Sequence, residues 1–170
     1  MPVRPIVLFP HPVLKQKCDH ADPADPRAQA VARDLLDTLD SAPGVGVAAP
    51  QIGEALRIAV VDATRSQRHA AAGQGRFVLF NPEIIHREGE QLFREGCLSI
   101  PEYTGNVRRA LRITVRAAGL NGEALDLTAV GFEAVVFQHE LDHLDGVLFL
   151  DRIADIKTDL FRRKPRRPES

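Results

Sequence analysis

The chain has 170 residues, of which 44% are hydrophobic, so it has the usual size of one domain and enough apolar side chains for a sizeable core. Its formal net charge of −1 argues against general binding to DNA or to a membrane. No run approaches the roughly 18 apolar residues of a membrane span, and residues 1–13 lack a targeting pattern, so we expect a cytoplasmic protein. In that compartment Cys18 and Cys97 predict no disulfide framework and remain available for other chemistry.

The first predicted helix spans about residues 26–40. Asp25 is a typical N-cap, and Pro26 suits the first helical position. Apolar residues then recur three and four positions apart, a spacing that gathers them on one face of a helix. They are Ala28, Val31, Ala32, Leu35, Leu36 and Leu39. We expect this face to pack on the core.

Residues 41–53 form an apolar, glycine-rich segment whose prolines exclude an ordinary helix. The segment contains a loose Gly-x-Gly-x-x-Ala pattern, but a dinucleotide fingerprint needs a strand before it and a helix after it. Here a helix precedes the pattern and Pro50 blocks a following one, so we reject a dinucleotide site. We interpret the segment as a loop whose glycines let backbone groups approach a ligand, with Gln51 as its polar side chain.

Strand-like runs follow at residues 57–63, 77–81, 111–117 and 124–130, and the polar segment 63–75 is expected to be a mobile surface loop. Helices are predicted over about residues 132–144 and 155–163. Most connections are too short for crossover helices, so the sheets should be largely antiparallel. We therefore predict a single α+β domain over residues 1–170, with mostly antiparallel sheets packed around a central metal-binding helix and a further helix near the C-terminus.

The sequence His139-Glu140-Leu141-Asp142-His143 is the main chemical signal in the chain. Positions i and i+4 lie on the same side of a helix, so His139 and His143 can bind one metal ion. Glu140 points away from the line joining them but stays close enough to reach a water molecule on the metal. The pattern predicts two ligands and a general base.

A catalytic site of this kind usually needs a third protein ligand. The sole glutamate after His143 is Glu169 in the terminal tail, and Phe149 stands where a His-Glu-x-x-His-x-x-Gly-x-x-His motif needs its third histidine. Both common peptidase patterns therefore fail. Cys97, in a loop bounded by glycine and proline, is the best remaining candidate, and a Cys-His-His set suits Zn, Fe(II), Co or Ni.

Three separate motifs closely resemble those of the peptide deformylase family: residues 44–51 (GVGVAAPQ), 95–99 (EGCLS) and 138–143 (QHELDH). Their order and spacing match as well, over roughly residues 5–163, and the chain looks like the shorter bacterial class. The resemblance implies removal of the N-formyl group from the first methionine of new polypeptides, with release of formate. It also implies one divalent metal ion, Fe2+ in the cell with Zn2+, Ni2+ or Co2+ as substitutes, held by Cys97, His139 and His143.

Further roles come with the same resemblance. Glu140 becomes the catalytic carboxylate, and the Gln51 side-chain amide and the Leu98 backbone N–H become donors to the oxyanion. Glu95 is expected to pair with Arg109 and so to stiffen the cysteine loop. The substrate-binding set is expected to include, besides Glu95, the residues Gly44, Val45, Gly46, Phe132, Val135 and Val136.

The predicted partners are N-formyl-Met nascent peptides, bound by a monomer. The basic tail over about residues 162–170 has two interpretations, a solvated end of the chain or a docking site for ribosomal RNA, and we favour the first. Two other functions stay open: a metallopeptidase that uses the same helix, and a non-catalytic relative that binds nascent chains. Cleavage of internal bonds in unformylated peptides would identify the former, and degraded ligand positions, which this chain lacks, would mark the latter.

Overall fold

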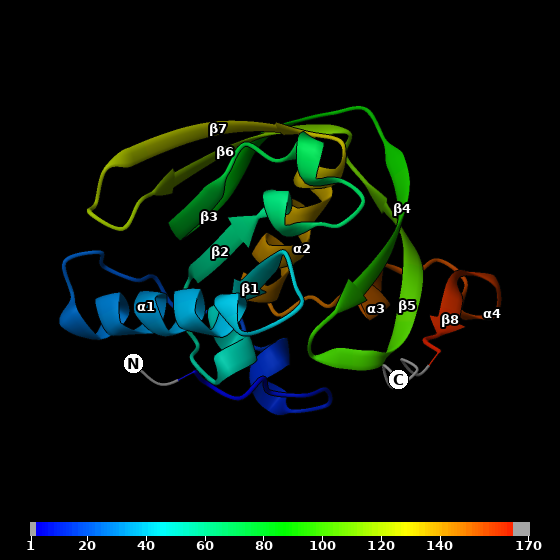
Figure 1. The fold of residues 1–170 in the computed structure, drawn as a ribbon, viewed down its shortest axis with the longest axis horizontal. Coiled ribbons are helices and arrows are strands. Elements are labelled where there is room, and N and C mark those ends of the chain that lie inside the picture. The colour runs from blue at the N-terminus through cyan, green and yellow to red at the C-terminus, as the bar shows by residue number, and fades with distance from the viewer. Residues whose placement is uncertain (1–2, 165–170) are drawn as a thin grey trace.

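Two antiparallel sheets enclose one helix at the centre of the molecule (Figure 1). The computed structural model describes residues 3–164. Within that range a five-stranded sheet has the order β1-β2-β3-β6-β7 and a three-stranded sheet has the order β4-β5-β8. The strands are β1 Gly46–Ala48, β2 Ile58–Asp62, β3 Arg76–Glu88, β4 Gln91–Cys97, β5 Ile100–Arg109, β6 Arg112–Ala118, β7 Ala124–Val130 and β8 Leu160–Arg162. The helices are α1 Pro26–Asp40, α2 Phe132–Leu144, α3 Phe149–Arg152 and α4 Ile156–Asp159.

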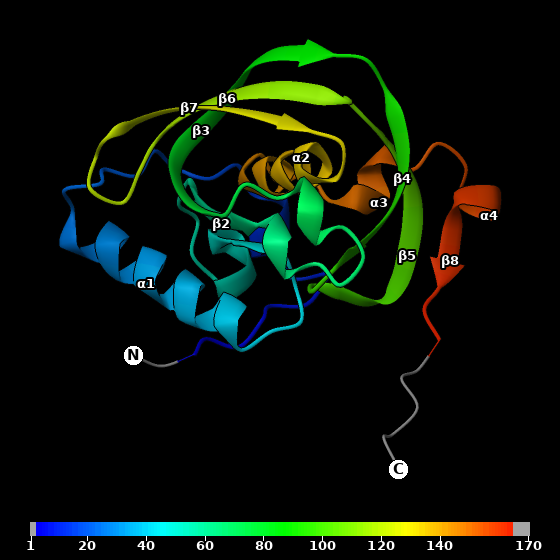
Figure 2. The same ribbon diagram turned by 45° about the horizontal axis from the view of Figure 1, so that its top comes forward.

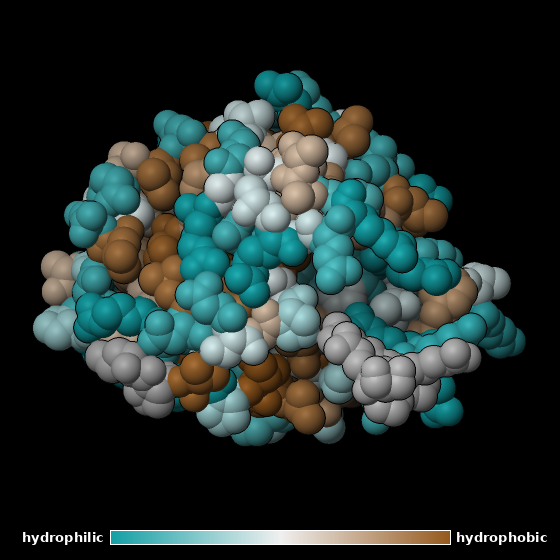
Figure 3. All heavy atoms as spheres, in the orientation of Figure 1, coloured by the Kyte–Doolittle hydropathy of each residue, from teal (hydrophilic) through white to brown (hydrophobic). Residues whose placement is uncertain are grey.

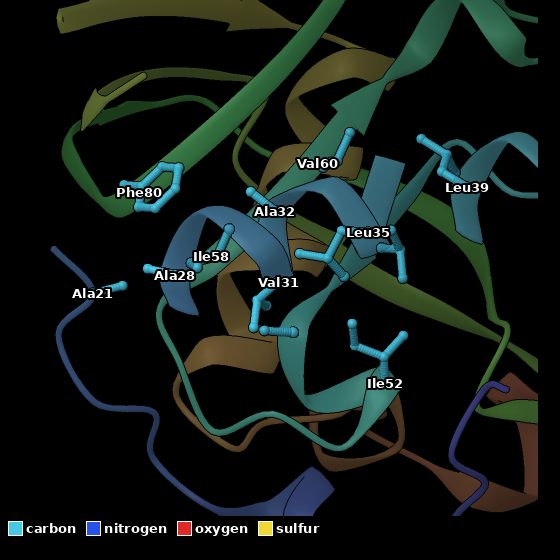
Figure 4. Packing of buried hydrophobic residues seen from close by; sticks show 12 residues of the cluster. Ala21, Ala28, Val31, Ala32, Leu35, Leu39, Ile52, Ile58, Val60 and Phe80 are labelled. Atoms are coloured by element: carbon cyan, nitrogen blue, oxygen red, sulfur yellow. The ribbon is translucent and has the colours of Figure 1, made fainter. Parts of the chain in front are cut away.

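Helix α1 covers one end of the larger sheet. The Asp25 carboxylate accepts a hydrogen bond from the Arg27 N–H (3.0 Å), and Pro26 occupies the first turn, so the predicted start of the helix is confirmed. Its apolar stripe packs on β2 and on neighbours that include Ile52 and Phe80 (Figure 4). The helix ends at Asp40, the predicted position.

Helix α2 lies beneath the arch of β3, β6 and β7, with β4 and β5 to its right in Figure 2. Its bounds match the predicted ones. The strands of every pair in the two sheets run antiparallel, which confirms the predicted fold class. None of the helices in residues 3–164 is long and apolar enough to span a membrane.

Several strands were not predicted. The segment expected to be a loop from 41 to 53 contains β1 and a 3₁₀ turn at Ala49–Ile52, and Cys97 ends strand β4 instead of lying in a loop. Strand β3 continues beyond the predicted run 77–81, through an irregularity after Phe80 where Asn81 adopts a positive φ of 52°. The Asn81 side chain hydrogen-bonds both backbone groups of Ala21 (2.8 and 2.7 Å), which supports this conformation.

The predicted helix over 155–163 is only partly present. Helix α4 makes one turn, and the next residues form β8, which pairs with β5 from Tyr103 to Gly105. Phe161 lies under the Arg94 guanidinium of β4 and pairs with Thr104 of β5, so tertiary contacts with these two strands outweigh the local helical pattern. Of the predicted basic tail, residues 162–164 belong to the described part of the chain, and the rest lies outside it.

Candidate metal centre

The structure brings Cys97, His139 and His143 together. Their candidate ligand atoms all lie within 4.8 Å of one another, and this is the one such group among residues 3–164. Cys97 arrives at the end of β4, while the two histidines lie one turn apart on α2. The Cys97 Sγ atom is 3.3 Å from His143 Nε2, and the imidazole centroids are 5.0 Å apart.

The chemistry of these donors fits a divalent metal ion. Burial alone would raise the pKa of the Cys97 thiol, but His143 and His139 outweigh it and hold that pKa well below its ordinary value. Burial instead raises the pKa of Cys18, the other cysteine, to about 11. Cys97 is therefore the thiolate-forming cysteine, and three soft or intermediate donors at this spacing can hold one ion.

A chain of buried charges supports His139 from behind. Glu95 Oε1 lies 2.9 Å from His139 Nδ1, and Arg109 donates to both Glu95 oxygens (2.6 and 2.8 Å), so the structure contains the expected Glu95–Arg109 pair. Arg109 also donates to Asp142 (2.6 Å), which accepts two hydrogen bonds from Arg152. Although burial opposes it, the bonds from Arg109 and His139 lower the pKa of Glu95 to about 2. These contacts fix the imidazole ring and its tautomer.

This network refines the expectation for Glu95. Glu95 lines the cavity described below, yet both carboxylate oxygens already accept hydrogen bonds from Arg109, and Oε1 also faces His139. The geometry suits orientation of His139. Asp142 and Arg152 were not predicted, although Asp142 lies within the His-Glu-x-x-His motif, three residues after His139 and so on a neighbouring position of the helix surface.

Glu140 points into the same site and depends on a glycine opposite it. A Cβ atom on Gly46 would lie 2.8 Å from Glu140 Oε1, so the carboxylate can pack there because residue 46 has no side chain. Burial raises the pKa of Glu140, and its Oε2 atom has no hydrogen-bond partner among the described protein groups. A buried carboxylate with a raised pKa and a free oxygen can exchange a proton with a bound molecule.

Gln51 presents its amide nitrogen to the site in a fixed orientation. Its Oε1 atom accepts a hydrogen bond from the Ala48 N–H (3.0 Å), which leaves Nε2 to face Ser99 Oγ at 3.2 Å and Cys97 Sγ at 3.6 Å. The 3₁₀ turn after β1 delivers this side chain, and Gln51 is 1% exposed. In this position the amide can donate to a ligand beside Cys97 in exchange for its long contact with Cys97 Sγ.

A cavity of about 260 Å³ opens beside Cys97 and His139. Its lining includes every residue of the predicted substrate-binding set: Gly44, Val45, Gly46, Glu95, Phe132, Val135 and Val136. Leu98 and the unpredicted Phe93 also line it. Phe93 faces inward because it lies two and four positions before Glu95 and Cys97 in β4, so all three side chains share one face of the strand. This period of two can be read from the sequence.

The segment before β1 is held in place from outside the cavity. Arg65 donates to the carbonyls of Leu39, Ala42 and Gly44 at 2.9–3.0 Å, and the Asp62 N–H donates to the Val45 carbonyl (2.7 Å). The Gly44 and Val45 carbonyls thus already accept one hydrogen bond each from the chain.

The segment from 63 to 75, expected to be a surface loop, also approaches the wall of the cavity. His69 is exposed, but its ring packs against Phe132 in a tilted arrangement with centroids 4.8 Å apart, and against the edge of Phe93 at 5.6 Å. Gln74 from the same segment hydrogen-bonds Glu133 on α2 through its backbone N–H (2.8 Å). These contacts connect the segment to the start of α2, the helix that carries two of the candidate ligands.

Comparisons with known proteins agree with one another. The family model for polypeptide deformylase matches residues 3–159. A peptide deformylase of Acidobacterium capsulatum is 42% identical over 167 residues, which cover 98% of this chain and 96% of that protein. The crystal structure of a peptide deformylase from Legionella pneumophila superposes with a TM-score of 0.83 at 36% identity, covering 92% of this chain and 89% of that one. A class I type b peptide deformylase from Acinetobacter baumannii, bound to Met-Ala-Ser, superposes with a TM-score of 0.83 at 32% identity, over 89% and 99% of the two chains. Matches of this extent establish that the chain belongs to the peptide deformylase family of enzymes.

Proposed function

We propose that this enzyme removes the N-formyl group from the first methionine of newly made polypeptides and releases formate. The observation that carries the proposal is the group of Cys97, His139 and His143 beside the Glu140 carboxylate and the Gln51 amide, at one end of an apolar cavity. Cys97, His139 and His143 would hold one divalent metal ion, Fe2+ in the cell with Zn2+, Ni2+ or Co2+ able to replace it. The bound ion supplies Lewis-acid activation of a water molecule and of the formyl oxygen.

Glu140 carries out the proton transfers in this scheme. As general base it accepts a proton from the attacking water, and as general acid it returns that proton to the leaving α-amino group of methionine. Its raised pKa, caused mainly by burial, brings it closer to neutral pH and suits both steps. The close approach to Gly46 keeps the carboxylate in one position during the exchange.

Gln51 and Leu98 stabilise the charge that develops on the formyl oxygen. The Gln51 Nε2 group is already oriented by its contacts with Ala48 and Ser99, so it donates to the oxyanion without paying for reorganisation. Leu98 follows Cys97 directly and lines the cavity, and we assign its backbone N–H the second donor role. Loss of one such donor typically costs about 3 kcal/mol of barrier, on the order of a hundredfold in rate.

The methionine side chain is proposed to occupy the apolar cavity between β4 and α2. Phe93, Phe132, Val135 and Val136 supply its wall, which suits an unbranched thioether chain. The Acinetobacter baumannii relative binds Met-Ala-Ser, the peptide that remains when formyl-Met-Ala-Ser loses its formyl group. An extended peptide could lie along the segment from Gly44 to Gly46 as an added strand.

The monomeric state and a cytoplasmic location are parts of the proposal, whereas docking of the basic tail on the ribosome is the less favoured of its two interpretations. Nascent chains carry formyl-methionine where they leave the ribosome, so the reaction belongs in that compartment. Arg162, Arg163 and Lys164 make the described part of the basic tail. Salt-sensitive co-sedimentation with ribosomes, lost on deletion of residues 162–170, would support a docking role for that tail.

The direct test measures formate release by anaerobically prepared, metal-loaded enzyme. We expect turnover of formyl-Met-Ala-Ser, little turnover of acetyl-Met-Ala-Ser, and no internal cleavage of unformylated peptides. One metal equivalent per chain should be lost in Cys97→Ala and retained in Cys18→Ala. Cleavage of internal peptide bonds would instead identify a metallopeptidase, and binding without turnover would identify a non-catalytic relative.

A further inference from the structure

The outer face of β4 carries a guanidinium group at the mouth of the cavity. Arg163 follows β8, and its backbone N–H donates to the Glu102 carbonyl (2.7 Å). From there its side chain reaches β4, where a Cβ atom built on Gly96 would lie 2.3 Å from Arg163 Nη2. Only a residue without a side chain at position 96 lets the guanidinium lie there, and Arg163 also lines the cavity.

Arg94 brings a second positive charge to the same face. Its guanidinium carbon lies 3.6 Å from the centroid of the Phe161 ring, a cation–π contact that holds it beside β8. Arg94 and Gly96 are two residues apart in one strand, so they face the same side of the sheet. The surface over β4, β5 and β8 is largely hydrophilic in Figure 3.

Neither guanidinium has a carboxylate partner within the described range 3–164. Two exposed positive charges at the mouth of a substrate cavity attract an anionic group on the ligand. The planar fork of an arginine matches a carboxylate through two parallel hydrogen bonds.

Strand geometry indicates which part of a peptide meets these charges. One edge of β4 pairs with β5, and no strand among the described residues pairs with the other edge, so an extended peptide can add there. Side chains of an extended chain alternate between two faces. If the first methionine points inward with Phe93 and Cys97, as the proposed function requires, the next side chain points outward, toward Arg94 and Arg163.

We propose that Arg163, assisted by Arg94, selects a carboxylate side chain, aspartate or glutamate, at the residue that follows formyl-methionine. The inference rests on the proposed deformylase function and adds a specificity to it. Both guanidinium groups are exposed, so the preference is modest, about two- to fivefold in kcat/KM for glutamate over glutamine. The contact lies away from the formyl group and is equal in ground and transition states, so the difference falls on KM.

The test compares formyl-Met-Glu-Ala, formyl-Met-Gln-Ala and formyl-Met-Lys-Ala, all as C-terminal amides so that the side chain supplies the only difference in charge. We expect kcat/KM to fall in the order Glu, Gln, Lys. Because exposed charges are screened, the ratio of Glu to Gln should shrink toward one between about 50 mM and about 500 mM salt. A ratio of one at low salt overturns the proposal.

Variants then assign the effect to the two arginines. Arg163→Gln should bring the ratio of Glu to Gln close to one, and Arg94→Gln should reduce the ratio in part. Gly96→Ala should also reduce it, because the added methyl displaces the Arg163 guanidinium. Arg108→Gln is the matched control, since Arg108 is an exposed arginine of β5 that pairs with Glu90 and lines neither cavity that Arg163 lines.

The outcomes are separable. If the loaded enzyme deformylates none of the three peptides, the proposed function fails; if it deformylates all three equally, only the present inference fails. A wild-type ratio in Arg163→Gln overturns the inference even if that variant loses binding to ribosomes, a result that would assign this surface to RNA. Thermal melting of each variant verifies that the fold is retained.

Discussion

Helices α1 and α2 are both covered by other elements, but they are buried in opposite ways. α1 presents one apolar stripe to the larger sheet, and Thr38 is its only buried polar residue. α2 is buried along its whole length except at Phe132 and His139. Its buried polar residues are Glu133, Gln138, Glu140, Asp142 and His143.

The difference shows where the fold places polar groups without partners. Buried polar groups cost free energy unless they are hydrogen-bonded. On α2 Glu133 bonds Gln74, Gln138 bonds Ala110, and Asp142 bonds two arginines. The buried side-chain atoms left without a partner among the described protein groups are Glu140 Oε2 and His143 Nδ1, and both residues belong to the candidate metal centre. α1 therefore contributes stability alone, whereas α2 contributes stability and chemistry, and single substitutions should separate the two.

The largest expected effect is on activity, from Glu140→Gln. This change keeps the shape of the side chain but removes the proposed general base, so turnover of formyl-Met-Ala-Ser should fall on the order of 10²- to 10⁴-fold. Because Glu140 is not one of the three proposed ligands, the metal content should stay at one equivalent. Glu133→Gln is the matched control on the same helix: it loses a bond with Gln74 and should retain most of the turnover. Normal turnover in Glu140→Gln would remove it from the mechanism.

The next largest effect is expected from Arg109→Met, which breaks the charge network behind α2. Glu95 and Asp142 lose their shared partner, and Arg109 is only 4% exposed, so unfolding should become easier by roughly 3–5 kcal/mol. Urea denaturation of the metal-free protein measures this change, and metal titration should show weaker binding because His139 loses its orientation. The adjacent Arg108→Met, at an exposed ion pair, should cost less than about 1 kcal/mol. Equal losses in the two variants would contradict a structural role for the buried network.

Leu35→Ala tests the other helix. Leu35 is fully buried in the cluster between α1 and β2, so removal of three carbon atoms should cost about 2–5 kcal/mol of stability. The free energy of unfolding should fall, while kcat and KM of the folded fraction stay at wild-type values. Arg33→Ala, an exposed position on the same helix, serves as the control. A large drop in kcat for Leu35→Ala would show that α1 contributes to the site after all.

The sequence predicted these two helices through different signals. α1 follows from its apolar period and its Asp25 cap, and α2 follows from the spacing of His139 and His143. No third ligand follows His143, and a catalytic site with two histidine ligands needs another donor. This requirement led to the prediction of Cys97. Local sequence patterns were therefore sufficient to predict α1, α2 and the group of candidate ligands.

Features that depend on tertiary pairing were missed. Strands β4 and β5 contain glycine, proline and charged residues, so their propensity is weak, and they exist because they pair with each other. Arg152 reaches Asp142 from a separate helix, and Arg163 reaches Gly96 across β5, contacts that no local pattern encodes. The segment after Asp159 has a helical pattern, yet its pairing with β5 makes it a strand.

The smallest effect is expected from Asp25→Ala, at the N-cap of α1. The Asp25 carboxylate accepts a hydrogen bond from the Arg27 N–H (3.0 Å) and faces the positive end of the helix dipole, so its loss should cost about 1 kcal/mol. Asp37→Ala, inside the same helix, removes the same charge without removing a cap and should be neutral or slightly stabilising, because alanine has the higher helix propensity. The difference between these two free energies of unfolding isolates the cap from the general effect of charge. Both variants should deformylate at the wild-type rate, since α1 holds none of the groups assigned to the chemistry. A cap variant with reduced kcat at full folding would mean that the two helices are coupled through the segment from Ser41 to Gly46, which connects the end of α1 to the wall of the cavity.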